Sequence, residues 1–377
     1  MSNPMPNSEK AYEMLERLWE EIRKIPETEL MRKSYLKDKE LRHAIKRIIR
    51  GKTKSYRYAI ITQVLAKIVD PAINCLALQL KSELPGSFDA RSFCRKVLVR
   101  FERNRLGYIL GGSDDPYVSK PLRHDEVSLK YLEEIRDKDG WRDLYAFLNS
   151  VEKMEKMERV DVLREILLEI YKYMFEVEKA YLGIKQDLNK KKKIRIDTLT
   201  LIDVIDEFLS HPSGGARPQI VAYSLITIFN ERTNVFNNIA TSRATVANEF
   251  ARRLADIECK DASGNVKLAV AVTETLTQEK FREEVNKAIR RKINRLLLLA
   301  HKIQQINQLV EVYMQKYRLN ITVLSIKDFT ALLTTLLNNQ LCLEVVNKIS
   351  ENLKRFEYPK HLLAWEKILR KKGILIT

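Results

Sequence analysis

The stretch ADIECKDASGNVKLAVAVTE, residues 255–274, constrains the fold more than any other part of the 377-residue chain. On both sides of a Ser-Gly pair, apolar and polar residues alternate with the period of two that is typical of β-strands. A two-residue loop at Ser263–Gly264 would make the stretch a hairpin in which Asp256 lies across from Ala271. We therefore expect one apolar face, and a second face on which Asp256 and Glu258 point the same way.

The segments around this hairpin alternate between helical and strand patterns. ATVANEFARRL before it has the spacing of a short helix, and TQEKFREEVNKAIRRK after it that of a helix with Thr277 as N-cap. INRLLLLAHK is typical of a buried strand, IQQINQLVEVYMQKY of a helix and NITVLS of a further strand. The order α-β-β-α-β-α-β predicts an α-rich α/β fold, with a mixed sheet flanked by helices.

The first two-thirds of the chain is typical of helices. RYAIITQVLAKIVDPAINCLALQLKSEL is an apolar stretch broken by Pro71, and DARSFCRKVLVRFERNRLG predicts a helix with Asp89 as N-cap and Gly107 at its end. The aperiodic GYILGGSDDPYVSKPLRHDE predicts a loop, and helices resume over about 128–188.

A lysine run at Lys190–Lys193 predicts a solvated linker. We place the domain boundary there, between a helical region of residues 1–190 and an α/β domain of residues 191–377. HPSGGARPQ, residues 211–219, follows one helical segment and precedes another, so it predicts a glycine-rich turn between two helices.

The balance of charge indicates a polyanionic partner. Lysine and arginine number 67 against 50 aspartates and glutamates, a net charge of +17. Nucleic acid is the commonest partner of so basic a chain, and an anionic membrane is a weaker candidate. A lysine-rich solubilising surface explains the same charge without any partner.

The sequence gives no indication of a membrane or an oxidising compartment. No run of about 18 apolar residues is present, and the N-terminus lacks the apolar core of a signal peptide. The four cysteines, at 75, 94, 259 and 342, are far apart and form no CxxC pair. We expect buried, reduced thiols in a cytoplasmic protein.

The hairpin face that carries Asp256 and Glu258 has the oxygen ligands that a hard divalent cation such as Mg²⁺ requires, with room for water and a phosphate. A nuclease built this way normally adds a carboxylate across the ladder and a lysine two residues on. Here those places hold Ala271 and Thr273. The alternative is that both acids line the solvated face of an ordinary hairpin.

Five stretches together resemble the SacI-type restriction endonuclease family. They are SYRYAIITQVLAKIVDPAINCLALQ, GSFDARSFCRKVLVRFE, LGGSDDPYVSKPLR, HPSGGARPQIVAYSL and DIECKDASGNVKLAVAV, in the family's order, over about residues 30–275. The resemblance implies a PD-(D/E)xK nuclease core, in which one strand carries Asp and the next carries Glu-x-Lys. It places Asp256 at the first acid, Ala271 at the Glu and Thr273 at the Lys.

Two explanations of Ala271 are open. It is either an engineered Glu-to-Ala change that silences the enzyme, which we favour because its surroundings are intact, or the mark of a natural relative whose carboxylate is lost or moved. Lys280, in the first turn of the next helix, is the nearest replacement for the lysine, although an exposed lysine in an amphipathic helix is the favoured explanation. Glu274 points to the opposite face of a regular strand, and Glu249 is a candidate outer carboxylate.

Three segments are candidates for contact with DNA. KRIIRGKTKSYRY mixes cations with a glycine and tyrosines, HPSGGARPQ combines two glycines with a helix start that favours an anion, and GGSDDPYVSKPLR is long and polar enough to read bases. For the first segment a solvated helix end is the alternative, for the second a plain helix–helix turn, and for the third the ordering of the helical region. The candidate contact residues are Lys52, Lys54, Arg57, Asp114, Asp115, Lys120, Arg123, Ser213, Gly214, Gly215 and Arg217.

These observations predict a Mg²⁺-dependent type II restriction endonuclease that cuts double-stranded DNA. A palindromic site cut on both strands would require a homodimer. The catalytic residues are predicted at Asp256, Ala271, Thr273 and Lys280, and the metal ligands at Asp256 and Glu258. The rival hypothesis is a non-catalytic nucleic-acid-binding protein on a nuclease scaffold.

Overall fold

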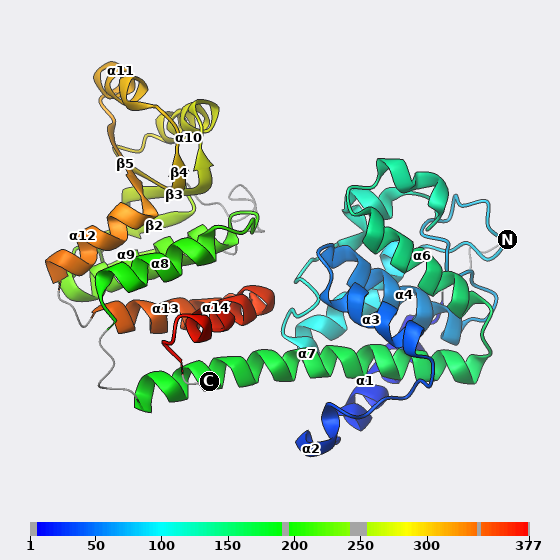
Figure 1. The fold of residues 1–377 in the computed structure, drawn as a ribbon. Helices are drawn as coiled ribbons and strands as arrows, with labels where there is room; N and C mark the ends of the chain where they lie inside the picture. Colours follow the sequence, from blue (N-terminus) through cyan, green and yellow to red (C-terminus); the bar gives the residue numbers. More distant parts are fainter. Residues whose placement is uncertain (1–5, 191–195, 242–254, 338–340, 376–377) are drawn as a thin grey trace. The chain divides into compact units, whose positions relative to one another are not determined.

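The computed structural model describes residues 6–190, 196–241, 255–337 and 341–375. The chain divides into two compact units, Met1–Glu176 and Val177–Thr377. Helix α7 (Lys156–Lys190) continues from the first unit into the second. The lysine run at 190–193, apart from Lys190, lies outside the described residues. Both units are drawn in Figure 1.

The first unit is helical, as the sequence predicts. Its helix α4, which ends at Val69 just before Asp70 and Pro71, is buried along almost its whole length. Helices α1, α3, α5 and α6 pack around it (Figure 1). The helices of this unit before α7 are α1 (Ser8–Arg23), α2 (Glu27–Leu30), α3 (Lys39–Arg50), α4 (Lys54–Val69), α5 (Ala90–Cys94) and α6 (Lys138–Glu152).

The segment DARSFCRKVLVRFERNRLG is helical but not regular. It begins with Asp89, whose side chain accepts the N–H of Ser92, and α5 then passes into two π-helical turns, η1 (Arg95–Val99) and η2 (Glu102–Leu106). Gly107 ends it with φ of 53°, a left-handed conformation that glycine adopts without strain. The predicted cap and end are both confirmed.

The loop after Gly107 contains short 3₁₀ turns and no longer regular element. Two of them, η3 (Pro116–Val118) and η4 (Lys120–Arg123), contact each other, and η5 (Leu129–Glu134) leads into α6. A single antiparallel bridge joins Ala77 to Glu126 and brings this loop against the turn that follows Pro71.

The second unit contains a five-stranded mixed sheet in the order β1-β2-β3-β4-β5. The first three strands are antiparallel neighbours, and β4 and β5 run parallel to β3. The strands are β1 (Asn238–Thr241), β2 (Ile257–Lys260), β3 (Val266–Leu276), β4 (Arg295–Ile303) and β5 (Asn320–Ser325). The helices are α8 (Thr198–Leu209), α9 (Ala216–Thr233), α10 (Gln278–Arg290), α11 (Asn307–Tyr317), α12 (Ile326–Leu337), α13 (Leu341–Arg355) and α14 (Pro359–Lys371).

Helices cover both faces of this sheet. Ala269 and Ala271 of β3 lie in one apolar cluster with Phe281 and Val285 of α10. From the other side, helix α9 contacts β3 and β4, and helix α12 contacts β4 and β5 (Figure 1). The mixed α/β architecture is therefore confirmed. The alternative of a solvated hairpin face is wrong, because α10 covers the face that carries the two alanines and Glu258 is buried as well.

The predicted elements after the hairpin are all present, and the side chain of Thr277 caps α10 by accepting the N–H of Lys280. Strand β1 was not expected, because its four residues are too few to show a strand period. The predicted helix ATVANEFARRL, residues 244–254, lies outside the described residues, and so does Glu249 within it.

Candidate active site and nucleic-acid interface

The hairpin turn is longer than expected, but the predicted register holds where it matters. The N–H of Asp261 donates to the carbonyl of Asn265, so three residues form the loop instead of two, with Gly264 at φ of +82°. A bulge between Cys259 and Lys260 compensates for the extra residue. Ile257 then pairs with Val270, which places Asp256 across from residue 271.

Asp256 stands immediately before β2, half-buried, at the point where β1, β2 and β3 meet. Its Oδ2 accepts the N–H of Val272 at 2.8 Å, and its carbonyl accepts the hydroxyl of Thr241 at 2.7 Å. Gln219 of α9 also donates to that carbonyl, at 3.4 Å. These contacts fix the aspartate backbone between a helix and two strands.

Glu258, two residues further on, is only 3% exposed. Its Oε2 lies 2.8 Å from the ammonium of Lys260, which gives the buried carboxylate a partner of opposite charge. A buried carboxylate is costly unless it is paired or functional. Sequence reasoning missed Lys260, although its signal is visible: DIECK contains an acid, a second acid and a lysine at intervals of two, which is the spacing of one strand face.

The two positions at which the family resemblance implies Glu and Lys lie on β3. Ala271 is 5% exposed and belongs to the apolar cluster under α10, and Thr273 is half-buried with its hydroxyl donating to the carbonyl of Thr275 at 3.1 Å. Lys280 is held on its own helix, with its ammonium 3.0 Å from both Glu283 and Glu284. Burial alone would lower the pKa of Lys280, but its hydrogen bonds to these glutamates raise it.

In the described part of the chain, no group of three or more His, Cys, Asp or Glu side chains is arranged to hold a metal ion. The donors nearest to such a site are the carboxylates of Asp256 and Glu258. Two carboxylates suit Mg²⁺, which usually binds one or two of them and keeps several waters. The pair therefore fits a magnesium ion, but as an incomplete set.

The turn of residues 213–217, before α9, already contains an anion. The carboxylate of Glu274 accepts the N–H and the hydroxyl of Ser213, both at 2.7 Å, and the N–H of Gly215 at 3.3 Å. Gly214 and Gly215 have φ of +63° and +85°, conformations that favour glycine. Burial alone would raise the pKa of Glu274, but the hydrogen bonds from this turn lower it. The glycines are needed, but the acceptor is the protein's own carboxylate, so the predicted phosphate site is occupied.

Arg217 is 7% exposed and is bound within the second unit. Its Nη1 donates to the carbonyl of Phe208 at 2.6 Å, its Nε lies 3.1 Å from Nδ1 of His361, and its guanidinium lies over the Phe208 ring. Burial lowers the pKa of Arg217. We therefore withdraw Arg217, with the 213–217 turn, from the predicted DNA contacts and assign it to the packing of α8, α9 and α14.

Arg57 has the same kind of structural role in the first unit. It is 4% exposed, and its guanidinium donates to the carbonyls of Ile109 at 2.9 Å and Gly51 at 3.1 Å. These contacts tie α4 to the loop after η2, so we also withdraw Arg57 from the predicted DNA contacts. Lys52, in the turn before α4, and Lys54, at its start, are exposed and keep that assignment as a prediction.

The GGSDDPYVSKPLR loop is held from inside by Glu102. Oε1 of this buried glutamate accepts the N–H groups of Leu110, Gly111 and Gly112 at 2.9, 3.0 and 3.2 Å. Its Oε2 accepts the hydroxyl of Tyr58 at 2.5 Å. Burial raises the pKa of Glu102, against the effect of these hydrogen bonds. The loop is therefore an ordered structure on the helical core.

The predicted readers of this loop fall into two groups. Asp114 pairs with Arg103, and Asp115 accepts two hydrogen bonds from Nε and one from Nη2 of Arg91. Lys120 and Arg123 are exposed on η4, where the Nε of Arg123 donates to the carbonyl of Val118 at 2.6 Å. The carboxylates of both aspartates are thus bound to arginines, so the loop does not offer them to a base as unpaired acceptors.

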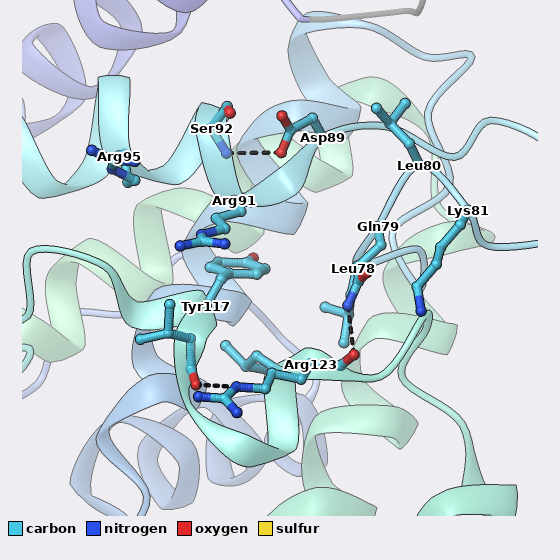
Figure 2. A pocket seen from close by; sticks show the side chains of 12 residues that line it. Leu78, Gln79, Leu80, Lys81, Asp89, Arg91, Ser92, Arg95, Tyr117 and Arg123 are labelled. Carbon is cyan, nitrogen blue, oxygen red and sulfur yellow. Dashed lines mark hydrogen bonds between the residues drawn. The ribbon is translucent and has the colours of Figure 1, made fainter.

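A cavity of about 800 Å³ opens beside this loop. Its cationic lining comes from Lys81, Arg91, Arg95 and Arg123, and we call it the arginine cavity (Figure 2). Sequence reasoning found Arg123 but missed Arg91 and Arg95, because they lie in a helical segment with no sign of function. Only the bridge at Ala77 and the fold of the loop bring the three arginines together.

Comparison with known families now identifies the chain. Residues 10–171 match the model of the SacI restriction endonuclease N-terminal domain, and residues 193–301 match that of its C-terminal domain. The chain belongs to the SacI restriction endonuclease family. As a member of this family it is a restriction endonuclease of the type II class and a DNA-binding protein. A search of curated proteins found no match.

The two SacI matches contain the features described above. The N-terminal match includes the arginine cavity, and the C-terminal match includes the β2–β3 hairpin with Asp256, Glu258 and position 271. Among the described residues, no helix is long and apolar enough to cross a membrane. All four cysteines are buried and unpaired, as the sequence predicts.

Proposed function

We propose that this chain binds one specific, palindromic sequence in double-stranded DNA as a homodimer, and that its reaction is Mg²⁺-dependent phosphodiester hydrolysis at the β2–β3 hairpin. The observation that carries the proposal is a row of three alternate residues: Asp256 directly before β2, and Glu258 and Lys260 on the strand itself. Glu258 is buried and paired with Lys260. Membership of the SacI family supports the reaction class. We further propose that residues 1–190 recognise DNA and residues 191–377 cut it.

Asp256 and Glu258 would hold the magnesium ion. When bound, such an ion lowers the pKa of a water molecule and withdraws charge from a phosphate. The protein's own contribution is to fix the two carboxylates: the N–H of Val272 orients Asp256, and Lys260 compensates the charge of Glu258.

The chain as written lacks the carboxylate that this fold expects at 271, so we propose that it binds its DNA site and cleaves it slowly or not at all. The test is plasmid cleavage with Mg²⁺ by the chain and by Ala271→Glu. A discrete fragment ladder from Ala271→Glu alone is the expected result. Because residue 271 is buried, Ala271→Asp and a thermal unfolding curve separate an inactive centre from an unfolded protein.

A second candidate arrangement is favoured by the Glu258–Lys260 pair. In it the carboxylate and lysine missing from 271 and 273 have moved to β2, and the chain as written is active. Cleavage by the unaltered chain that is lost in Glu258→Gln and in Lys260→Met would establish this arrangement. Asp256→Asn should abolish cleavage under either arrangement and is the common control.

The rival is a binding protein that retains the nuclease fold without turnover. It predicts no cleavage by the chain, by Ala271→Glu or by Ala271→Asp, although all three bind duplex DNA with a steep dependence on salt. That result would withdraw the proposed activity and leave Asp256 and Glu258 as structural acids of the hairpin.

A further inference from the structure

The arginine cavity has a buried floor and a cationic rim. Tyr117, Leu78 and Leu122 at its floor are buried or nearly so, and the hydroxyl of Tyr117 accepts a hydrogen bond from Gln63 at 3.3 Å. Figure 2 shows Arg91 and Arg95 entering from the helical segment and Arg123 from the facing turn. A cavity of this size with few, convergent charged groups is typical of a ligand site.

The positive charge of the cavity is only partly compensated. Lys81 pairs with Asp125, and Arg91 with Asp115. Neither Arg95 nor Arg123 forms an ion pair in the described part of the chain, and the one acid in the lining, Asp89, accepts the N–H of Ser92 as a helix cap. The uncompensated positive charge favours a ligand that has anionic or hydrogen-bond-accepting groups.

Arg91 is oriented for such a ligand by Asp115. Its Nε and Nη2 bind the carboxylate at distances of 2.6–3.1 Å, so the guanidinium edge formed by Nη1 and the second hydrogen of Nη2 remains to donate. That edge matches two neighbouring acceptors, such as O6 and N7 of guanine or two phosphate oxygens. A guanidinium already fixed by a carboxylate loses less side-chain entropy on binding.

The support of Asp115 is itself rigid. Its N–H donates to the hydroxyl of Ser113 at 3.3 Å, and the N–H of Ser113 donates to the hydroxyl of Tyr58 at 3.0 Å. Tyr58 belongs to the buried helix α4, and the same hydroxyl is bound to Glu102. A chain of hydrogen bonds therefore leads from the helical core to the arginine.

The neighbouring pair, Arg103 with Asp114, is a natural control. It has the same residue types, and its aspartate lies in the same loop, but neither residue lines the cavity. Both arginines are about half exposed, 53% for Arg91 and 48% for Arg103. Any effect of charge alone should therefore be shared by the two pairs.

We propose that the arginine cavity receives DNA, and that Arg91, aligned by Asp115, grips a pair of acceptor atoms there, on a guanine edge or on a phosphate. This inference rests on the proposed function, since it names residues that give this enzyme its grip on the DNA site. It assigns Asp115 to the positioning of an arginine, in place of direct base reading.

The test uses the full-length protein without Mg²⁺ and a pool of duplexes with a randomised central segment. The first step compares the DNA sequences that are enriched by four proteins: the unaltered chain, Arg91→Lys, Asp115→Asn and Arg103→Lys. The second step measures the affinity of each protein for an enriched and a scrambled duplex over a series of KCl concentrations. Arg91→Lys keeps the charge and removes the two-pronged donor. Arg95→Gln tests the cavity at a residue that has no ion pair to lose.

If Arg91 grips guanine, Arg91→Lys loses preference at one base pair and binds the enriched duplex about tenfold to a hundredfold more weakly, whereas Arg103→Lys does not. If Arg91 grips a phosphate, Arg91→Lys binds all sequences more weakly. In that case Arg95→Gln should also lower the slope of log affinity against log salt concentration by about one unit. Arg91→Lys indistinguishable from the unaltered chain, or matched by Arg103→Lys, would overturn the inference. Failure of the unaltered chain to bind duplex DNA would instead overturn the proposed function.

Discussion

The 213–217 turn and the arginine cavity both have the residue types of an anion site, but the protein's own carboxylates fill the turn and compensate the cavity only in part. Glu274 lies on the amides of the turn, and Arg217 beside it binds main-chain oxygen. In the cavity, Arg95 and Arg123 have no carboxylate partner in the described residues. The difference shows that a glycine-rich turn with an arginine is not evidence for a phosphate-binding site until its hydrogen-bond partners within the protein are known.

The Gly111–Gly112 stretch repeats the lesson of the turn. Its amides converge on Glu102, just as those of the turn converge on Glu274. In both places glycine permits left-handed backbone, and a carboxylate from another element accepts hydrogen bonds from the N–H groups. Both glycine pairs therefore stabilise the fold.

The largest effect should come from removing a buried arginine. We expect Arg57→Met to destabilise the protein by about 3 kcal/mol, because the carbonyls of Ile109 and Gly51 lose their donor. Arg95→Gln, at an exposed arginine of the cavity, should cost no more than about 0.5 kcal/mol. Urea unfolding followed by circular dichroism measures both. If Arg57→Met instead keeps its stability and loses DNA affinity, the contrast between buried and cavity arginines fails.

Removal of the internal anion should have the next largest effect. We expect Glu274→Ala to cost about 2 kcal/mol, because the hydroxyl and N–H groups of the 213–217 turn lose their acceptor. Inorganic phosphate should then raise the melting temperature of the variant more than chloride at equal ionic strength, since the emptied turn can bind it. Glu311→Ala, on an exposed face of α11, is the matched control and should show neither effect. A variant as stable as the unaltered chain would contradict the assignment of the turn.

The smallest effect is a dependence on pH. The folded pKa of Glu274 is lowered from 4.5, so its ionised form stabilises the fold fully above that value, and the contribution is lost as pH falls through the lower folded pKa. The unaltered chain should exceed Glu274→Gln in unfolding free energy by about 1 kcal/mol at neutral pH. The difference should shrink below pH 4.5, as unfolding curves at several pH values would show. A gap that widens in acid would mean that the carboxylate is not bound as an anion.

The elements of the fold could be predicted wherever a period extended over enough residues. The helix caps at Asp89 and Thr277 and the hairpin register of Asp256 followed from short-range rules. The loop length at 262–264 was wrong by one residue, because a bulge elsewhere in the strand can absorb such a difference without moving the buried pairs. Strand β1 is defined by its partner β2, which no local pattern reveals.

The sequence by itself determined the class of the chain, the hairpin with its two acids and the surplus of positive charge, because composition and local periodicity are properties of neighbouring residues. Tertiary structure decided which charges are open to a partner. The sequence made Arg57 and Arg217 candidate DNA contacts and gave no such indication for Arg91 and Arg95. The structure buries the first two arginines and leaves the other two exposed. Whether a guanidinium contacts a carbonyl, a carboxylate or solvent depends on residues that are distant in the sequence and that only the fold brings close to it, as Ile109 is to Arg57 and His361 to Arg217.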